Sequence, residues 1–235
     1  MTELSKKYRE LVTEILVKGQ TQDCRNGSQR IIPHHSFTLD FSRHDNHLLK
    51  LRKMYVKGIE GEFQTLIDPT PLVNISQFEA NGCNYWKLWA DKHGNLSVDY
   101  HNKMHPRLKN LISDIKIDPT SRRHILNLWD QDNVDNCTLS LPCCWYDMTF
   151  SVIGGVLHMR WTQRSVDTMV GLPSDIYLAY RFMNYIAEAT DLAIGSCMFS
   201  LSNVHIYDEH IDKAMELLNR TENDSEVPLS FELKS

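Results

Sequence analysis

Two adjacent cysteines, Cys143 and Cys144, begin a segment whose composition predicts a β-strand. A cysteine thiolate is a strong nucleophile, and neighbouring strand residues point to opposite faces, so one thiol can face a cleft while the other packs inside. Arg122 and Arg123 precede the pair, and Arg164 follows it. Guanidinium groups close to a thiol stabilise its thiolate form. The pattern indicates covalent catalysis by one thiol, although a buried core thiol is the ordinary alternative for any single cysteine.

Two polar clusters farther along the chain could hold a small ligand. Gln163, Arg164 and Ser165 are consecutive, and an arginine fork beside a serine hydroxyl can bind a phosphate group. A polar loop that closes a hairpin is the alternative for this cluster. His205 and Tyr207 alternate on a predicted strand, so both side chains project from one face. This face suits the hydroxyls of a sugar, and a hydrogen-bonded core histidine is the alternative.

These side chains must be positioned by elements that the apolar pattern predicts. Helical periodicity covers residues 2–18, 47–67, 174–190 and 208–219, with Ser174 as a plausible N-cap of the third helix. Strand patterns cover residues 30–40, 123–163 and 197–206, and residues 68–85 are predicted to form loop and short helix. Gly154 and Gly155 separate two alternating runs, which indicates a hairpin turn. We expect one α+β domain over residues 1–235, with a polar tail at 220–235 that is only partly ordered.

The composition limits the kinds of partner that the chain can have. Hydrophobic residues make up 42% and charged residues 23%, the net charge is −5, and no segment has membrane-spanning length. A long nucleic acid is therefore not an expected partner, nor is a membrane. The six cysteines show no metal-binding spacing and no export signal precedes them, so we expect free thiols in a cytoplasmic protein without a metal.

The motifs, taken in order, resemble those of the thymidylate synthase family from about Asp23 to His210. The matching motifs are Ser121-Arg122-Arg123, Leu141-Pro142-x-Cys144, Gln163-Arg164-Ser165-x-Asp167, Gly171-Leu172-Pro173 and His205-x-Tyr207. The segment from Trp86 to Tyr100 also looks like the folate side of that family. Its Leu-Pro-Pro-Cys-His motif places Cys144 on the nucleophile without a gap. The resemblance implies a mixed sheet flanked by helices and a homodimer formed by sheet-on-sheet packing.

The resemblance also implies residue roles and a co-substrate, 5,10-methylenetetrahydrofolate. Catalysis falls to Cys144, which adds to C6 of a pyrimidine, to Glu62, which orders water and moves protons, and to Asp175. Nucleotide binding falls to Arg25, Gln163, Arg164, Ser165, Asp175, His205 and Tyr207, with Arg122 and Arg123 reaching the phosphate from the other subunit. The resemblance assigns folate binding to Trp86, Tyr100, Asp167 and Gly171.

The position of Asp175 departs from the synthases, which have asparagine there to match the uracil edge. Cytosine presents the reverse edge, with an acceptor at N3 and a donor at the 4-amino group. A protonated carboxyl can donate to N3 and accept from the amine, and it can also protonate N3 during attack. Favourable placement at a helix N-terminus is the alternative role of Asp175. The aspartate favours the phage-type deoxycytidylate hydroxymethylase branch.

The end of the sequence bears on the product. Synthases continue past Ser235 into a tail that closes the folate site, and an open site favours water over hydride at the one-carbon unit. The retained Trp86 argues mildly for hydride transfer. We therefore expect hydroxymethylation of dCMP. The alternatives are a dCMP C5-methyltransferase, a dUMP-acting thymidylate synthase or hydroxymethylase with the same site, and an inactive nucleotide- or RNA-binding relative.

Overall fold

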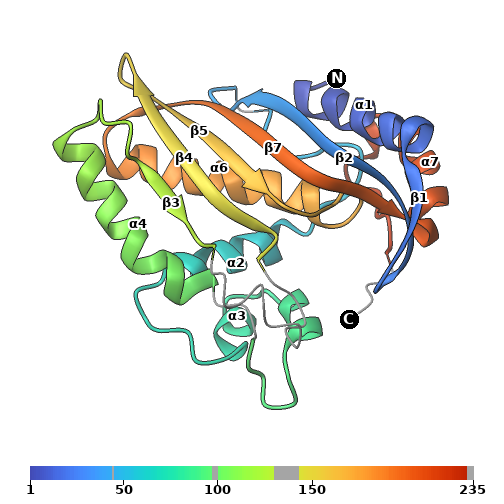
Figure 1. Cartoon of the computed structure of the whole chain (residues 1–235), viewed down its shortest axis with the longest axis horizontal. Helices are drawn as coiled ribbons and strands as arrows, with labels where there is room; N and C mark the ends of the chain where they lie inside the picture. The colour runs from blue at the N-terminus through green and yellow to red at the C-terminus, as the bar shows by residue number, and fades with distance from the viewer. Residues whose placement is uncertain (44, 97–99, 130–142, 232–235) are drawn as a thin grey trace.

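The computed structural model describes residues 1–43, 45–96, 100–129 and 143–231, which form a mixed sheet flanked by helices (Figure 1). The seven strands follow the order β1-β2-β7-β5-β4-β3, and β6 pairs with β7. The strands are β1 (Gln20–Cys24), β2 (Gly27–Asp40), β3 (Ile125–Asn127), β4 (Trp145–Ile153), β5 (Val156–Gln163), β6 (Val166–Asp167) and β7 (Ala193–Tyr207). Neighbours are antiparallel except for the pairs that β5 and β6 make with β7, so the predicted α+β class is confirmed.

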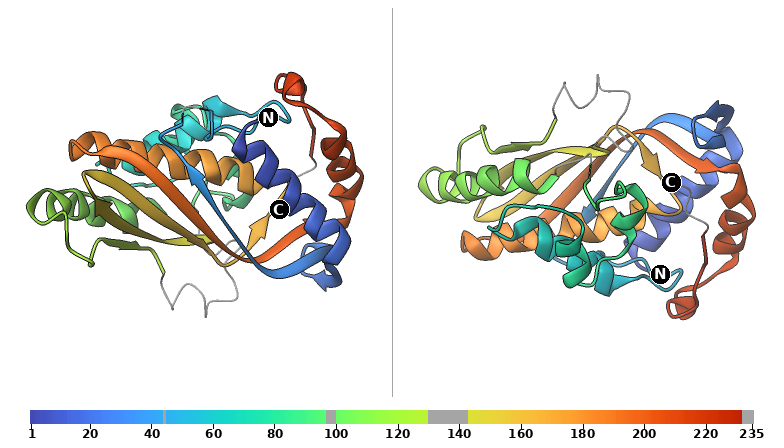
Figure 2. Two further views of the ribbon diagram at one scale, coloured as in Figure 1. Left: turned by 90° about the horizontal axis from the view of Figure 1, so that it is seen from above. Right: turned by 90° about the horizontal axis from the view of Figure 1, so that it is seen from below.

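The helices pack mainly behind the sheet as Figure 1 is drawn, and α6 runs across the backs of β5 and β7. The edge-on views of Figure 2 show no described helix over the face of β4, β5 and β7 that is turned toward the viewer in Figure 1. The α-helices are α1 (Glu3–Lys18), α2 (Val56–Ile67), α3 (Ser76–Ala80), α4 (Tyr100–Ile117), α6 (Gly171–Ala189) and α7 (Ile211–Asn219). Short 3₁₀ helices are η1 (Tyr85–Trp89), η2 (Asp208–His210) and η3 (Glu222–Asp224).

The first helix and the glycine hairpin are confirmed. Helix α1 agrees with the helix predicted over residues 2–18, and its buried apolar face consists of Leu4, Tyr8, Leu11, Val12 and Ile15. Between β4 and β5, Gly154 and Gly155 have φ angles of 59° and 78°. Both values are positive, as a type I′ turn requires, and such a turn keeps the twist of the two strands.

The helix predicted over residues 47–67 is shorter, because α2 begins only at Val56. The chain before it is fixed by side chains instead: Leu51 is fully buried, and the Arg52 guanidinium donates to the carbonyl of Met169 at 2.9 Å. Within α2, a Cβ on Gly61 would lie 2.3 Å from the carbonyl oxygen of Asn81. This glycine therefore lets α2 pack closely on the turn that follows α3.

The central helix α6 begins at Gly171, before Ser174, and its N-cap residue is Val170. The prediction that Ser174 caps this helix is therefore wrong. The Asp167 carboxylate orders the preceding turn, since its Oδ1 accepts from the backbone N–H groups of Met169 at 3.0 Å and Val170 at 3.1 Å. With these groups satisfied, the chain turns into the helix earlier than the sequence indicates.

The polar C-terminal segment contacts the rest of the domain as far as Phe231. The Arg220 guanidinium donates to the carbonyls of Val227 and Pro228, both at 3.0 Å, and Leu229 is buried. The Arg52 guanidinium lies 4.9 Å from the centre of the Phe231 ring. Residues 232–235, the end of the predicted tail, lie outside the described residues.

Candidate active site

The cysteine pair immediately precedes β4, and its two members differ in exposure. Cys143 is buried, whereas Cys144 is partly exposed. The backbone of Cys144 is held on both sides: its N–H donates to the Tyr100 hydroxyl at 2.7 Å, and its carbonyl accepts from the Arg164 N–H at 2.9 Å. The more exposed residue of the pair is thus the one that the motif register selects. Leu141 and Pro142 of that motif lie outside the described residues.

The charge around the pair differs from the sequence-based expectation. Arg164 Nε donates to the carbonyl of Cys143 at 2.8 Å, so this guanidinium lies beside the pair. Burial nevertheless raises the pKa of the Cys144 thiol to about 11, with Arg164 lowering it and the Asp175 carboxyl raising it. Arg164 therefore stabilises the thiolate, as the sequence predicts, but desolvation of the thiolate outweighs this one guanidinium.

Arg122 and Arg123 do not lie on a strand. Both are exposed in the bend before β3, which begins at Ile125, so the strand pattern predicted from residue 123 starts two residues too early. The Arg123 N–H donates to the Ser121 hydroxyl at 3.4 Å, which turns the chain before it can join the sheet. Among the three arginines first associated with the thiols, Arg164 is the one whose contact with the pair is observed.

The hairpin turn between β1 and β2 brings Arg25 to the side of the site formed by the end of β7. Arg25 is exposed in this turn. The side-chain amide of its neighbour Asn26 donates to the Tyr207 hydroxyl at 3.4 Å. The residue next to Arg25 in the chain therefore contacts Tyr207, a predicted sugar-binding residue.

His205 and Tyr207 share one face of β7, as the alternation predicts, with ring centres 5.0 Å apart. His205 is 5% exposed, and its Nδ1 pairs with the carbonyl of Asn203 at 2.8 Å. Its Nε2 is buried and has no hydrogen-bond partner among the residues that the structure describes. A buried ring nitrogen left in this way is a ready partner for a ligand hydroxyl.

The loop between β5 and α6 is fastened to the sheet. Asp167 pairs with His205 in the β6–β7 register, and the Asn203 amide donates to the carbonyl of Arg164 at 2.8 Å. Ser165 lies between these two fixed points and is partly buried. The loop thus holds predicted phosphate-side and folate-side residues next to the end of β7.

The acidic residue Glu62 on α2 is buried and receives two aromatic donors from η1. The Trp86 indole N–H donates to Oε1 at 2.9 Å, and the Tyr85 hydroxyl donates to Oε2. Burial raises the pKa of Glu62 to about 7, and these hydrogen bonds oppose the shift. Tyr85 was missed by the sequence reasoning, although its position next to Trp86 was a usable signal.

Asp175 is the fifth residue of α6 and lies at the end of a chain of hydrogen bonds. Its Oδ2 accepts from Gln163 Nε2 at 2.8 Å, and Gln163 Oε1 accepts from the Trp161 indole N–H at 3.0 Å. Burial raises the pKa of Asp175 to about 7; the bond from Gln163 opposes this shift, and the Glu62 and Asp167 carboxyls add to it. A Cβ on Gly171 would lie 3.6 Å from Asp175 Oδ2, so this glycine borders the same carboxyl.

A run of aromatic rings joins the two carboxyl groups. Trp86 meets Tyr100 edge to face at 5.8 Å, Tyr100 stacks on Trp145 at 4.3 Å, and Trp145 lies 4.9 Å from Trp161. Trp161 escaped the sequence reasoning, yet it lies two residues before Gln163 and therefore on the same face of β5. The ring-to-ring contacts therefore run from Trp86, which donates to Glu62, to Trp161, which leads through Gln163 to Asp175.

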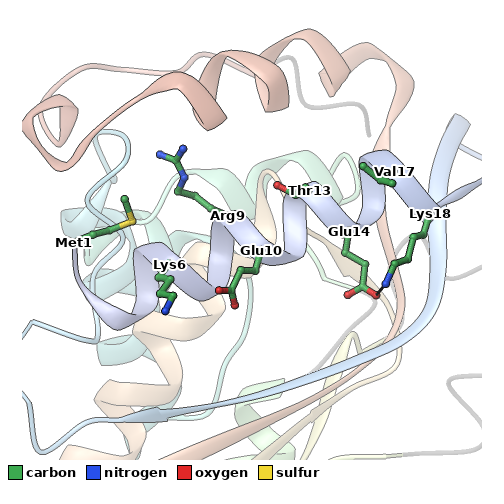
Figure 3. A pocket seen from close by; sticks show the side chains of 8 residues that line it. All are labelled: Met1, Lys6, Arg9, Glu10, Thr13, Glu14, Val17 and Lys18. Carbon is green, nitrogen blue, oxygen red and sulfur yellow. Dashed lines mark hydrogen bonds and ion pairs between the residues drawn. The ribbon is translucent and has the colours of Figure 1, made fainter.

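A separate hollow runs along the exposed side of α1, away from these residues (Figure 3). Its lining includes Lys6, Arg9, Glu10 and Glu14, and none of the candidate site residues contributes to it. Within the part of the chain that is described, no cluster of three or more His, Cys, Asp or Glu side chains could hold a metal ion. No described helix is both long and apolar enough to span a bilayer.

The pattern of the whole chain matches that of a known family. The family model described as thymidylate synthase covers residues 6–234 of this 235-residue sequence. The match therefore includes every candidate site residue described above.

Proposed function

This chain belongs to the thymidylate synthase family, and on that premise we propose that it is a deoxycytidylate 5-hydroxymethyltransferase. The family transfers a one-carbon unit from 5,10-methylenetetrahydrofolate, its co-substrate, to C5 of a pyrimidine nucleotide. In the proposed reaction, dCMP, methylenetetrahydrofolate and water give 5-hydroxymethyl-dCMP and tetrahydrofolate.

The observation that carries the choice of cytosine is the environment of Asp175. With its pKa raised to about 7, a large share of this carboxyl is protonated at neutral pH. A neutral carboxyl donates one hydrogen bond and accepts others, which matches N3 and the 4-amino group of cytosine. Because Gln163 offers Asp175 a donor, the acid proton of Asp175 remains available to the base.

Cys144 is the proposed nucleophile, because it is the more exposed residue of the pair and the one that the motif register selects. Its sulfur adds to C6 of the base, and the electrons displaced from the C5–C6 double bond make N3 basic. Asp175 then donates its proton to N3. The thiol pKa of about 11 means that Cys144 is protonated before attack; its proton passes to water as the bond from sulfur to C6 forms, and Arg164 stabilises the negative charge on the sulfur.

The nucleotide would lie between the loop after β5 and the end of β7. Arg164, Ser165 and Arg25 are proposed phosphate ligands, with Gln163 supporting the base edge through Asp175. His205 and Tyr207 are the proposed partners of the sugar hydroxyl. The buried Nε2 of His205, which has no partner among the described residues, supports this assignment.

The folate would lie on the side of η1 and the loop before α6. Trp86 and Tyr100 use their polar atoms within the chain, on Glu62 and Cys144 respectively, so a folate would contact them through the edges that their ring packing leaves. Asp167 orders the turn that leads into α6, and Gly171 begins that helix beside Asp175. Glu62, with a pKa near neutrality, is the proposed group that moves protons to and from the folate side.

A homodimer with shared phosphate sites completes the proposal. The uncovered sheet face carries an exposed row formed by Thr38, Met198 and Arg160, which face one another across β2, β7 and β5. A second copy packed on this face could bring its Arg122 and Arg123 to the phosphate. Their exposure in the single chain supports this role.

The proposal is tested with dCMP and dUMP carrying tritium at C5, each with methylenetetrahydrofolate. Attack at C6 and one-carbon transfer release this tritium, and we expect release from dCMP in large excess over dUMP. The mass of the dCMP product should increase by CH2O. An increase by CH2 with formation of dihydrofolate would identify a dCMP methyltransferase instead, and release from dUMP alone would overturn the reading of Asp175.

A further inference from the structure

Gln163 reaches Asp175 with its side-chain amide, and an amide has two chemically opposite ends. Its NH2 group donates and its oxygen accepts, and either end fits the same space. If the oxygen faced Asp175, it would accept the acid proton of that carboxyl. The base would then meet only acceptor atoms, which do not match N3 of cytosine. The direction of the Gln163 amide therefore decides whether the proton of Asp175 is available to a ligand.

The direction is determined by Trp161. An indole N–H is a donor without any acceptor capacity, so the atom of Gln163 that faces it must be the amide oxygen. The observed distances agree with this assignment: 3.0 Å from Trp161 Nε1 to Gln163 Oε1, and 2.8 Å from Gln163 Nε2 to Asp175 Oδ2. Gln163 is 1% exposed and Trp161 is fully buried, so water does not compete for either bond.

The indole itself is held by packing. Trp161 lies 4.9 Å from the Trp145 ring and 6.5 Å from the Phe182 ring on α6. Rotation of the indole would require these rings to move apart in a close-packed core. The donor direction is thus fixed by core residues that lie outside the ligand pocket.

We propose that Trp161 is a positioning residue for base specificity, which holds Gln163 as a donor so that Asp175 keeps its proton for cytosine N3. The inference rests on the proposed function and extends it from Asp175 to the core. Trp161 contacts neither substrate nor reacting atoms; it acts through Gln163. Its effect should therefore appear in the preference between bases and not only in stability.

Two variants alter the amide direction in different ways. Trp161→Phe removes the indole donor and lets the Gln163 amide turn over. Gln163→Glu keeps the shape but presents an acceptor to Asp175 in every orientation. The matched control is Phe41→Leu, which removes a buried ring that packs on Tyr180 and Phe199 and leaves both hydrogen bonds and the rings beside Trp161 in place.

For each protein, kcat/KM for tritium release is measured with dCMP and with dUMP, and folding is checked by thermal unfolding. We expect both variants to lower the dCMP-to-dUMP ratio by about tenfold or more, the usual effect of mispairing one buried polar group. Phe41→Leu should keep the wild-type ratio. If the wild type prefers dCMP and the dCMP-to-dUMP ratio is unchanged in folded Trp161→Phe and Gln163→Glu, the role of Trp161 is overturned and the proposed function is not. Absence of dCMP turnover in the wild type would instead overturn the proposed function.

Discussion

The backbone N–H of Cys144 donates to the hydroxyl oxygen of Tyr100 at 2.7 Å. This bond fixes the chain at the proposed nucleophile from a helix that the sequence places on the folate side. Tyr100→Phe leaves the N–H without its partner while the ring can still stack on Trp145. We expect kcat to fall by about tenfold, because the thiol is less well positioned and a partly buried donor is unpaired. Steady-state kinetics would show this, and an unchanged kcat would contradict the positioning role.

The exposure difference within the cysteine pair predicts unequal effects of mutation. Cys144→Ala should abolish tritium release from dCMP, since no other group can form the adduct at C6. Cys143→Ala removes a buried thiol that has no part in the proposed attack, and this variant should retain most of the activity. Denatured complexes with a mechanism-based pyrimidine can be weighed by mass spectrometry. A covalent adduct on the Cys144→Ala protein would reverse the assignment.

The pKa of Asp175 predicts how stability depends on pH. Its folded pKa is about 7, against an ordinary value of 3.8. Between about pH 4 and about pH 7 the folded chain holds a proton that the unfolded chain has lost, so the free energy of unfolding falls as the pH rises. Asp175→Asn does not titrate. The thermal stability of this variant relative to the wild type should therefore rise between about pH 4 and about pH 7 and stay constant above that range. A difference that is the same at every pH would refute the shift.

Tyr85 predicts a change in the pH profile of catalysis. Its hydrogen bond lowers the pKa of Glu62, which burial has raised to about 7. Tyr85→Phe should raise that pKa further, so the acidic limb of kcat moves to higher pH if ionised Glu62 is the active form. Glu62→Gln serves as the reference: it should lower kcat by about a hundredfold or more and lose the limb. An acidic limb that stays in place in Tyr85→Phe would separate Tyr85 from the proton transfer.

The proposed sharing of phosphate sites can be tested by mixing inactive subunits. One parent carries Cys144→Ala, and the other carries Arg122→Ala with Arg123→Ala. If the arginines serve the partner's site, each mixed dimer has one intact site. Random mixing should then restore about a quarter of wild-type activity, since half of the dimers are mixed and each has one working site of two. No recovery in a mixture whose subunits have exchanged would place the arginines in their own chain's site.

The order of motifs in the sequence was sufficient for the family, because each motif combines residue types whose chemistry is specific. Residue alternation also predicted the shared face of His205 and Tyr207 and the glycine hairpin, since both depend on local backbone geometry. The first turn of α6 was predicted less well. Asp167 satisfies the backbone there, and this contact does not follow from helix propensity.

The pKa values and the hydrogen-bond partners at the site were decided by tertiary structure. Desolvation gives Cys144 a raised pKa although Arg164 is beside it, because burial depends on every element packed around the thiol. In the same way, the sequence identifies residue 175 as an aspartate, but the burial that raises its pKa to about 7 comes from the elements packed around it. The sequence by itself determined which groups are present and in what order. Only the fold brought Trp161, Gln163 and Asp175 into line, because hydrogen bonds between β5 and α6 require both elements to be packed.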